Sequence, residues 1–344
     1  SGRREERLAL VPPTAERAAF RPVRDVVRLA LPVFATMASQ SLMGLTDVFF
    51  MRWVGEPEQA AVGLGSVATW TFFSLFAGTL SGVSTFVAQE HGAGRPREAG
   101  KYVWRSLWPV LPFAVPLAFA GPALRELLIL TGATEDVAAL AARYAEIRLW
   151  GAIFVFGGFA VVSFFRGLGD MMLPMWVTFG QNALNVALDA AFVFGLGPFP
   201  RLGLEGVAWA TVLSTVAGTA VYFVAFLRRR HREEHGVLQG LRPRLREALG
   251  FLRVGMPIGV SWVLEMIVWT IFTVYAASLG QVSLAANNIV MQIVHVSFMP
   301  GLALSIAAGT LVGRELGADR PANAARCGWA AVGVCLAYMG AMGL

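Results

Sequence analysis

Nine apolar runs, each long enough to cross a membrane as a helix, constrain the fold of this chain more than any other feature. A hydrocarbon core about 30 Å thick requires roughly 20 apolar residues in a spanning helix. Windows of that length follow one another along most of the chain, which predicts an all-α polytopic membrane protein. The predicted spans, numbered 1 to 9 in chain order, are Leu29–Met51, Ala60–Ala88, Tyr102–Ala123, Val137–Phe165, Leu173–Leu196, Val207–Leu227, Ala248–Leu279, Leu284–Val312 and Gly328 to the end.

The composition agrees with a membrane protein, because 56% of the residues are hydrophobic and 15% are charged, against about 25% charged in a soluble domain. The net charge of +6 would suit a nucleic-acid partner only if the basic residues formed a face or stripe on a folded domain. Here they cluster in short loops between apolar runs. The sequence has no nucleotide-binding loop, metal-ligand cluster or nucleophile beside a base. We therefore expect no enzymatic activity, no nucleic-acid partner and no cofactor.

Positive charges orient the predicted spans, because cytosolic loops carry an excess of Lys and Arg. Counting the N-terminal tail as one side and alternating after every span, that side receives 23 of the 28 Lys and Arg residues. The N-terminus is therefore predicted to be cytosolic, and no cation is expected within a span. The five basic residues on the opposite side are Arg52, Arg125, Arg143, Arg148 and Arg201.

An internal repeat organises the spans, since the chain matches itself without a gap after a shift of 225 residues. The shift places span 1 on span 7, both leaving the cytosol, so the copies have the same direction in the membrane. Several transporter folds contain such a parallel repeat. The matched pairs include Arg28 and Arg253, Pro32 and Pro257, Gly55 and Gly280, Ala60-Ala61 and Ala285-Ala286, Glu90 and Glu315, Gly92 and Gly317, Ala93 and Ala318, Arg95 and Arg320, and Pro96 and Pro321.

One repeat unit corresponds to six spans, so the chain is expected to hold about nine spans of twelve and to end within span 9. The expected parts are a cytosolic tail (1–23), an N-lobe of spans 1–6 (24–227), a basic cytosolic linker (228–247) and a partial C-lobe of spans 7–9 (248–344).

Three carboxylates, Asp47, Asp189 and Glu265, lie inside apolar runs that contain no Lys or Arg. An ionisable group at membrane depth costs roughly 2.5 to 3.5 kcal/mol on insertion scales, so its presence indicates a function. The predicted orientation places Asp47 and Asp189 with Tyr144 and Thr211 at similar depths, roughly 6 to 11 Å below the outer boundary. These four side chains are predicted to line one polar site in the outer half of the first lobe.

Helical spacing adds further polar residues to this site. A polar stripe on a membrane helix faces protein or water, because lipid cannot satisfy its hydrogen bonds. Two like charges close together in a medium of low dielectric constant favour uptake of a proton. The same set of oxygen and amide ligands would also suit a hard cation such as Na⁺. The predicted stripes are Asn182, Asn185 and Asp189 on span 5, and Thr36, Gln40 and Asp47 on span 1.

In sequence order, these motifs make the chain resemble the multidrug and toxic compound extrusion (MATE) antiporters, nearest their DinF branch. The resemblance covers Arg24 to Leu344. It rests on Pro32 and Asp47 in span 1, Tyr144, Arg166-Gly167-Leu168-Gly169-Asp170 after span 4, Asn185-Val186-Ala187-Leu188-Asp189 in span 5, and Gly206-Val207-Ala208-Trp209-Ala210-Thr211 opening span 6.

The resemblance implies two six-helix lobes around a central cavity that opens alternately to the two membrane faces. It implies export of amphipathic, often cationic small molecules against entry of H⁺ or Na⁺, with H⁺ favoured here, by a multi-pass protein of the bacterial inner (plasma) membrane that is expected to be monomeric. In DinF-type members the position matching Pro32 bends span 1, in agreement with the helix-breaking effect of proline. The implied cation site consists of Asp47, Tyr144, Asn185, Asp189 and Thr211.

Glu265 departs from the DinF pattern and matches a glutamate of span 7 typical of the NorM branch. There it belongs to a cation site in the second lobe, whose usual acidic partner lies on span 10. The chain is therefore expected to carry a complete first-lobe site and half of a second one, with coupling assigned to the first. The predicted lining of the substrate cavity is Gln40, Asn182, Asn288 and Gln292.

Other interpretations stay open. Asp47 could be an interfacial carboxylate near Arg52, and Tyr144 and Thr211 could be ordinary packing residues. Pro32 could simply mark the start of its apolar run. A flippase for lipid-linked oligosaccharides of the same superfamily would need basic residues in its cavity, whereas the spans are predicted to hold only acids. A cation channel would conduct ions without coupling them to a cargo.

Overall fold

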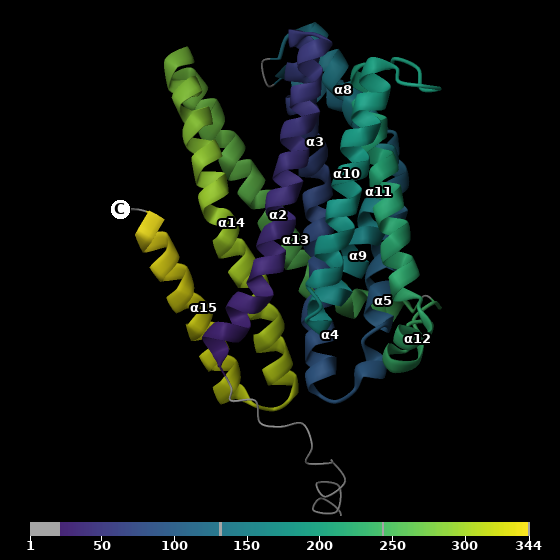
Figure 1. Ribbon diagram of the computed structural model, residues 1–344, viewed down its shortest axis with the longest axis vertical. Coiled ribbons are helices and arrows are strands. Elements are labelled where there is room, and N and C mark those ends of the chain that lie inside the picture. Colours follow the sequence, from purple (N-terminus) through teal and green to yellow (C-terminus); the bar gives the residue numbers. More distant parts are fainter. Residues whose placement is uncertain (1–20, 131–132, 243, 343–344) are drawn as a thin grey trace, which may run out of the picture.

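The computed structural model describes residues 21–130, 133–242 and 244–342, which form a bundle of long helices (Figure 1). Within these ranges the chain forms helices and turns and contains no β-strand. The all-α class is therefore confirmed. Most of the predicted cytosolic tail, residues 1–20, lies outside the described residues.

The helices follow the apolar runs of the sequence. Their bounds are α2 (Pro22–Phe50), α3 (Glu56–Ser81), α4 (Val83–Gly92), α5 (Lys101–Val110), α6 (Ala114–Ala118), α7 (Gly121–Leu130), α8 (Glu135–Trp150), α9 (Ala152–Leu168), α10 (Met172–Phe194), α11 (Leu204–Phe226), α12 (Arg229–His235), α13 (Leu245–Ser278), α14 (Gln281–Gly317) and α15 (Pro321–Met342), with short 3₁₀ turns at Met51–Trp53, Pro96–Glu98 and Leu111–Phe113.

Six helical segments in the described part are long and apolar enough to cross a membrane, or eight if each of two bent pairs counts as one span. These eight correspond to all predicted spans except span 5. Its helix α10 has 23 residues, enough to span, but does not meet the same apolarity criterion. The reason is the polar stripe of Asn182, Asn185 and Asp189, which the surrounding helices cover.

Two predicted spans are bent at identifiable residues. Span 4 turns by 55° between α8 and α9, where Gly151 forms the only break. Span 3 turns by 69° between α6 and α7. Three prolines interrupt the helical backbone hydrogen bonds before that bend, because proline lacks the N–H donor. They are Pro109, Pro112 and Pro116.

The polar stripe of α10 is enclosed because α10 packs between α2 and α11. The first helix α2 also packs against α14 and α15, while α3 packs against both α8 and α13. The helices α2 and α3 therefore join the two ends of the sequence in one bundle (Figure 1).

The structure repeats itself at the same shift of 225 positions as the sequence. Gly55 and Gly280 precede α3 and α14, and the helical stretches that follow end at Gly92 and Gly317. The next turns also match. Arg95 N donates to Glu90 O and Arg320 N donates to Glu315 O, both at 2.9 Å, and Gly94 (φ +71°) matches Asp319 (φ +57°).

Small residues line the contact between α3 and α13. Gly78 on α3 and Gly82 directly after it face Gly259 and Gly255 on α13, each pair spaced by four residues. A Cβ atom on Gly78 would lie 2.7 Å from the Cα atom of Gly259. Without side chains at these positions the two backbones approach closely, as in other small-residue contacts between membrane helices.

The segment between α11 and α13 is docked on the first half of the chain. Gly100 N donates to His235 O at 2.9 Å, and Trp104 Nε1 donates to Val237 O at 2.7 Å. Arg105 Nε then pairs with Glu247 Oε2 at 2.6 Å, which ties the first turn of α13 to α5. We call this end of the bundle, where α12 lies, the linker end (Figure 1).

Candidate functional site

Two buried carboxylates from different helices meet inside the bundle. Asp47 is in the last turn of α2 and 3% exposed, and Asp189 is on α10 and fully buried. Their carboxyl groups approach closely enough to share a hydrogen bond if one of them carries a proton. The predicted pairing of these two acids is therefore present in the structure.

Asn185 and Thr211 complete the first layer around the acid pair. Asn185 Nδ2 donates to Thr211 Oγ1 at 3.4 Å, and Thr211 Oγ1 lies 3.5 Å from Asp47 Oδ2. The same hydroxyl lies 3.0 Å from Val207 O. Since a hydroxyl has one hydrogen, and the backbone oxygen is nearer, Asp47 receives at best a long hydrogen bond from Thr211.

Several acceptor oxygens of the acid pair and of the α10 polar stripe lack donors. In the described part of the chain, no hydrogen-bond partner is present for Asp47 Oδ1, both carboxylate oxygens of Asp189, Asn185 Oδ1 and Asn182 Oδ1. Buried acceptors without donors are rare and call for an ion, a proton or water. Two carboxylates, an amide oxygen and a hydroxyl form a donor set that fits a proton or Na⁺.

A transition-metal site receives no support from the described residues. No group of three His, Cys, Asp or Glu side chains among them is placed to hold a metal ion.

Tyr144 lies beside the acid pair on α8, fully buried. Its hydroxyl oxygen accepts from Ser66 Oγ at 3.2 Å and from Arg148 Nη1 at 2.8 Å. Tyr144 and Asp47 interact electrostatically, although no hydrogen bond joins them among the described contacts. The structure thus brings all five predicted cation-site residues into one region, with Tyr144 at its edge.

Arg148 corrects the sequence analysis. The charge count assigned it to the outer side and left the spans with acids only, although the predicted bounds of span 4 (137–165) include it; the structure shows it half-buried within α8, one turn beyond Tyr144. Its guanidinium carbon lies 5.6 Å from the centre of the Tyr144 ring. The count failed because α8 is polar along much of its length, which hides the boundary between loop and span.

The second predicted stripe, on α2, is only partly correct. Thr36 and Asp47 are buried, but Gln40 between them is exposed. Asn182 instead donates its amide to Ser39 Oγ, a residue that the sequence analysis did not single out. Ser39 lies at i−1 from Gln40, so only knowledge of how α2 faces α10 identifies it.

Pro32 lies in the interior of α2, and Pro257 lies at the matching place in α13. Thr36 Oγ1 donates to Pro32 O and Ser261 Oγ donates to Pro257 O, both at 2.8 Å. Since residue 261 is residue 36 shifted by 225, the repeat extends to these side-chain hydrogen bonds. Each proline lies in the interior of its helix, because each helix begins ten or more residues earlier.

The residues predicted for the second lobe are not assembled into a site. Glu265 is exposed on α13, and the described contacts include no hydrogen bond or ion pair to it. The side chains of Asn288 and Gln292 on α14 lie outside the described ones. The predicted substrate cavity therefore stays a prediction.

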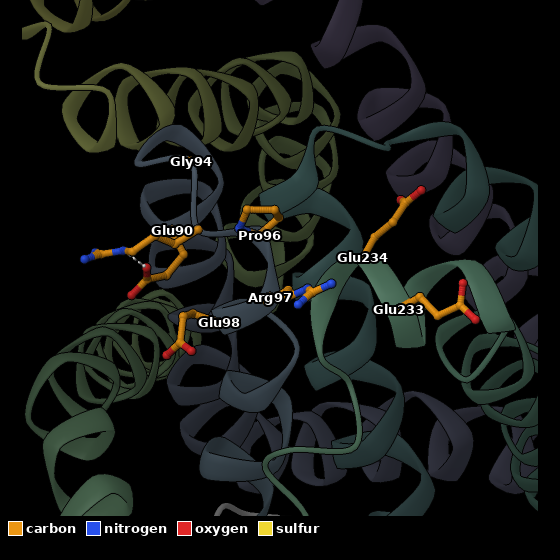
Figure 2. A pocket seen from close by; sticks show the side chains of 8 residues that line it. Glu90, Gly94, Pro96, Arg97, Glu98, Glu233 and Glu234 are labelled. Carbon is orange, nitrogen blue, oxygen red and sulfur yellow. Dashed lines mark hydrogen bonds and ion pairs between the residues drawn. The ribbon is translucent and has the colours of Figure 1, made fainter. Parts of the chain in front are cut away.

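A separate hollow of about 1000 Å³ opens at the linker end (Figure 2). It is far along the helices from the acid pair, so it is not part of the candidate site. Four of its lining side chains are glutamates, and Glu90 is paired with Arg95. The lining residues are Glu90, Gly94, Arg95, Pro96, Arg97, Glu98, Glu233 and Glu234.

Membrane-length helices around two buried acids, whose oxygens mostly lack donors among the described residues, define a polytopic helical protein of the transporter class. The family model described as MatE matches residues 32–191 and 257–344. The chain therefore belongs to the MATE family. Both matched stretches begin at the repeated prolines, Pro32 and Pro257.

Individual relatives agree with this family. The probable multidrug resistance protein NorM of Burkholderia pseudomallei is 31% identical over 341 residues, covering 98% of this chain and 71% of the relative. The probable multidrug resistance protein YoeA of Bacillus subtilis is 28% identical over 300 residues, covering 86% of this chain and 65% of YoeA. These curated names do not include DinF, so the predicted branch stays a prediction.

Solved structures with the same fold include a MOP superfamily transporter from Pyrococcus furiosus, with a TM-score of 0.83 and 26% identity over 93% of this chain and 71% of that chain. A multidrug resistance MATE family transporter in an outward-facing conformation gives a TM-score of 0.82 at 26% identity, with the same coverage. The chain is accordingly similar to about seven-tenths of these transporters.

Proposed function

We propose that this protein is a secondary active exporter that couples entry of a cation to the export of amphipathic, often cationic small molecules by alternating access. The single observation that carries this proposal is the buried pair of Asp47 and Asp189 with its partnerless oxygens. Two like charges held together in a medium of low dielectric constant require a proton or a metal cation to compensate them. A site that must gain and lose a cation can couple its gradient to transport.

We assign coupling to Asp47, Asn185, Asp189 and Thr211, with Tyr144 beside them, and favour H⁺ over Na⁺. The shared-proton geometry of the two carboxyl groups supports H⁺. Glu265 remains a candidate for a second site, but its exposure and lack of described partners give it no comparable environment.

The test is efflux of a cationic dye from liposomes containing the purified protein, driven by a proton or sodium gradient. Asp189→Asn should abolish gradient-driven efflux, since the carboxamide keeps the shape but cannot exchange a proton. Asp136→Asn is the matched control, because Asp136 is exposed in the first turn of α8. If Asp189→Asn transports the dye as fast as the wild type under both gradients, the proposal is wrong.

Glu265→Gln tests the second lobe in the same assay. We expect it to leave the dependence on the driving cation unchanged. Loss of sodium dependence in Glu265→Gln alone would move coupling to the second lobe.

The position of Arg148 supports the flippase alternative, because a flippase needs basic residues in its cavity and a basic residue does lie within a span. A flippase would move a lipid-linked pyrophosphate between leaflets while failing to export the dye. A channel would pass ionic current without dye movement.

A further inference from the structure

Among the described residues, no carboxylate is in direct contact with the guanidinium group of Arg148. Arg143, five residues earlier on α8, pairs with Glu146 at 3.1 Å and Glu205 at 3.0 Å. Arg148, in contrast, has no ion pair within 4 Å in the described part of the chain, and its direct partner is the neutral phenol of Tyr144. An arginine in a membrane span without a bound acid is costly, which points to a function.

The carboxylates that interact with Arg148 at longer range are those of the candidate site. Its charge acts on both Asp47 and Asp189. The described groups that interact with this acid pair are Arg148, Tyr144 and Thr211, and Asn185 donates to Thr211. Among these groups Arg148 is the single cation.

The charges of the two carboxylates and Arg148 determine how many cations neutralise the site. Two ionised carboxylates and one guanidinium leave a net charge of −1, so one cation neutralises the site. Without Arg148 the net charge is −2, and the first cation is held more tightly. A fixed positive charge near a cation site opposes binding, and it also speeds release.

Tyr144 lies between Arg148 and the acid pair in the network of contacts: it bonds to Arg148 and interacts electrostatically with Asp47. Its hydroxyl oxygen accepts from Arg148 and Ser66, so its own hydrogen is directed away from both donors. Asp47 Oδ1 is a buried acceptor without a donor in the described structure. Arg148 thereby fixes the orientation of the Tyr144 phenol, which interacts electrostatically with Asp47.

We propose that Arg148 is a positioning residue and built-in counter-cation of the first-lobe site, which limits the site to one coupling cation and lowers its affinity so that the cation is released. This inference rests on the proposed function and names the residue that tunes it.

The experiment measures dye efflux from proteoliposomes at a series of driving-cation concentrations, for protons and for Na⁺ separately. Arg148→Gln should lower the half-saturating concentration of the coupling cation roughly tenfold or more, the effect expected of a unit charge within about 12 Å at an effective dielectric constant of about 20. Its maximal rate should fall because release becomes slow. Arg148→Lys, which keeps the charge, should retain the wild-type half-saturation even if its rate is reduced.

Arg143→Gln is the matched control and should keep the wild-type half-saturation, because Arg143 is satisfied by two glutamates at the rim. If Arg148→Gln fails to fold, Arg148→Met is the second neutral variant. The inference is overturned if a folded neutral variant has the wild-type half-saturating concentration, or if Arg148→Lys shifts it as much as Arg148→Gln.

Failure of the proposed function looks different in this assay. In that case Asp189→Asn transports like the wild type, whatever Arg148 variants do. If Asp189→Asn is inactive while neutral Arg148 variants keep the wild-type half-saturation, the proposed function stands and only the role of Arg148 fails.

Discussion

Gly92 and Gly317 occupy equivalent positions in the contact between α4 and α14. A Cβ atom on Gly92 would collide with the carbonyl oxygen of Arg314, and one on Gly317 would collide with that of Gln89. Arg314 is itself Gln89 shifted by the repeat length of 225 residues. The contact is therefore reciprocal, which places the pseudo-two-fold axis of the repeat between these two helices at the linker end.

Alanine at either glycine should destabilise the protein. The added methyl group would force the α4 and α14 backbones apart, and such overpacking typically costs about 1 to 3 kcal/mol. Thermal unfolding of the purified protein measures this loss for Gly92→Ala and Gly317→Ala. Gly309→Ala is the control on α14, because a Cβ there meets nothing within 4 Å. Equal melting temperatures for Gly92→Ala and Gly309→Ala would refute the packing role.

Replacing one acid should stabilise the resting protein. Asp189→Asn removes one of two buried like charges, and an uncompensated buried charge typically destabilises a fold by several kcal/mol. We expect its melting temperature near neutral pH to rise above that of the wild type. Asp136→Asn, at an exposed carboxylate, should leave it unchanged. A lower melting temperature for Asp189→Asn would mean that the ionised pair is already compensated.

Thr211→Val should change binding of the coupling cation without loss of folding. Valine keeps the shape of threonine but removes the hydroxyl between Asn185 and Asp47. One neutral hydrogen-bonding group contributes about 0.5 to 1.5 kcal/mol, so loss of an oxygen ligand should raise the half-saturating Na⁺ concentration roughly two- to tenfold, whereas loss of a donor to ionised Asp47 should lower the half-saturating proton concentration by a similar factor. Thr215→Val is the control, because Thr215 contacts Gln181 instead. An unchanged half-saturation in Thr211→Val would exclude the hydroxyl as a ligand.

Docking of α12 should depend on pH through His235. Burial, then the nearby His231, lowers the pKa of His235 from 6.5 to about 4, while Glu234 acts in the opposite direction. Because the docked state favours the neutral ring, docking is fully stable above pH 6.5 and weakens as the pH falls toward 4.

Hydrogen exchange of residues 228–240, corrected for the intrinsic pH dependence, measures this effect. Exchange should speed up below about pH 6 in the wild type. It should become nearly independent of pH in His235→Asn, whereas His295→Gln, at an exposed histidine of α14, should behave like the wild type. A pH response that persists in His235→Asn would assign it to another group.

Much of the fold follows from periodic features of the sequence. Apolar runs predicted the helices, and the repeat predicted matching ends at Gly92 and Gly317. Helical spacing correctly placed Asn182, Asn185 and Asp189 on one buried face. Such patterns work because a polar stripe in a membrane helix has to be covered by protein.

Other features depend on how helices face one another, which no local pattern contains. Ser39, and not Gln40, meets Asn182 because of the rotation of α2 against α10. Because α8 is polar, the charge count assigned Arg148 to the outer side and not to the span that contains it. The bend at Gly151 likewise left no trace in the apolar run that it interrupts.

The docked segment between α11 and α13 limits how α13 can move. Gly240 packs against the backbone of Lys101, and α13 begins at Leu245, so positions 241–244 join the docked segment to α13. A stretch of that length reaches at most about 15 to 20 Å when fully extended. Together with the Arg105–Glu247 pair, this short connection lets α13 tilt about the linker end but prevents it from separating from the first half of the chain there.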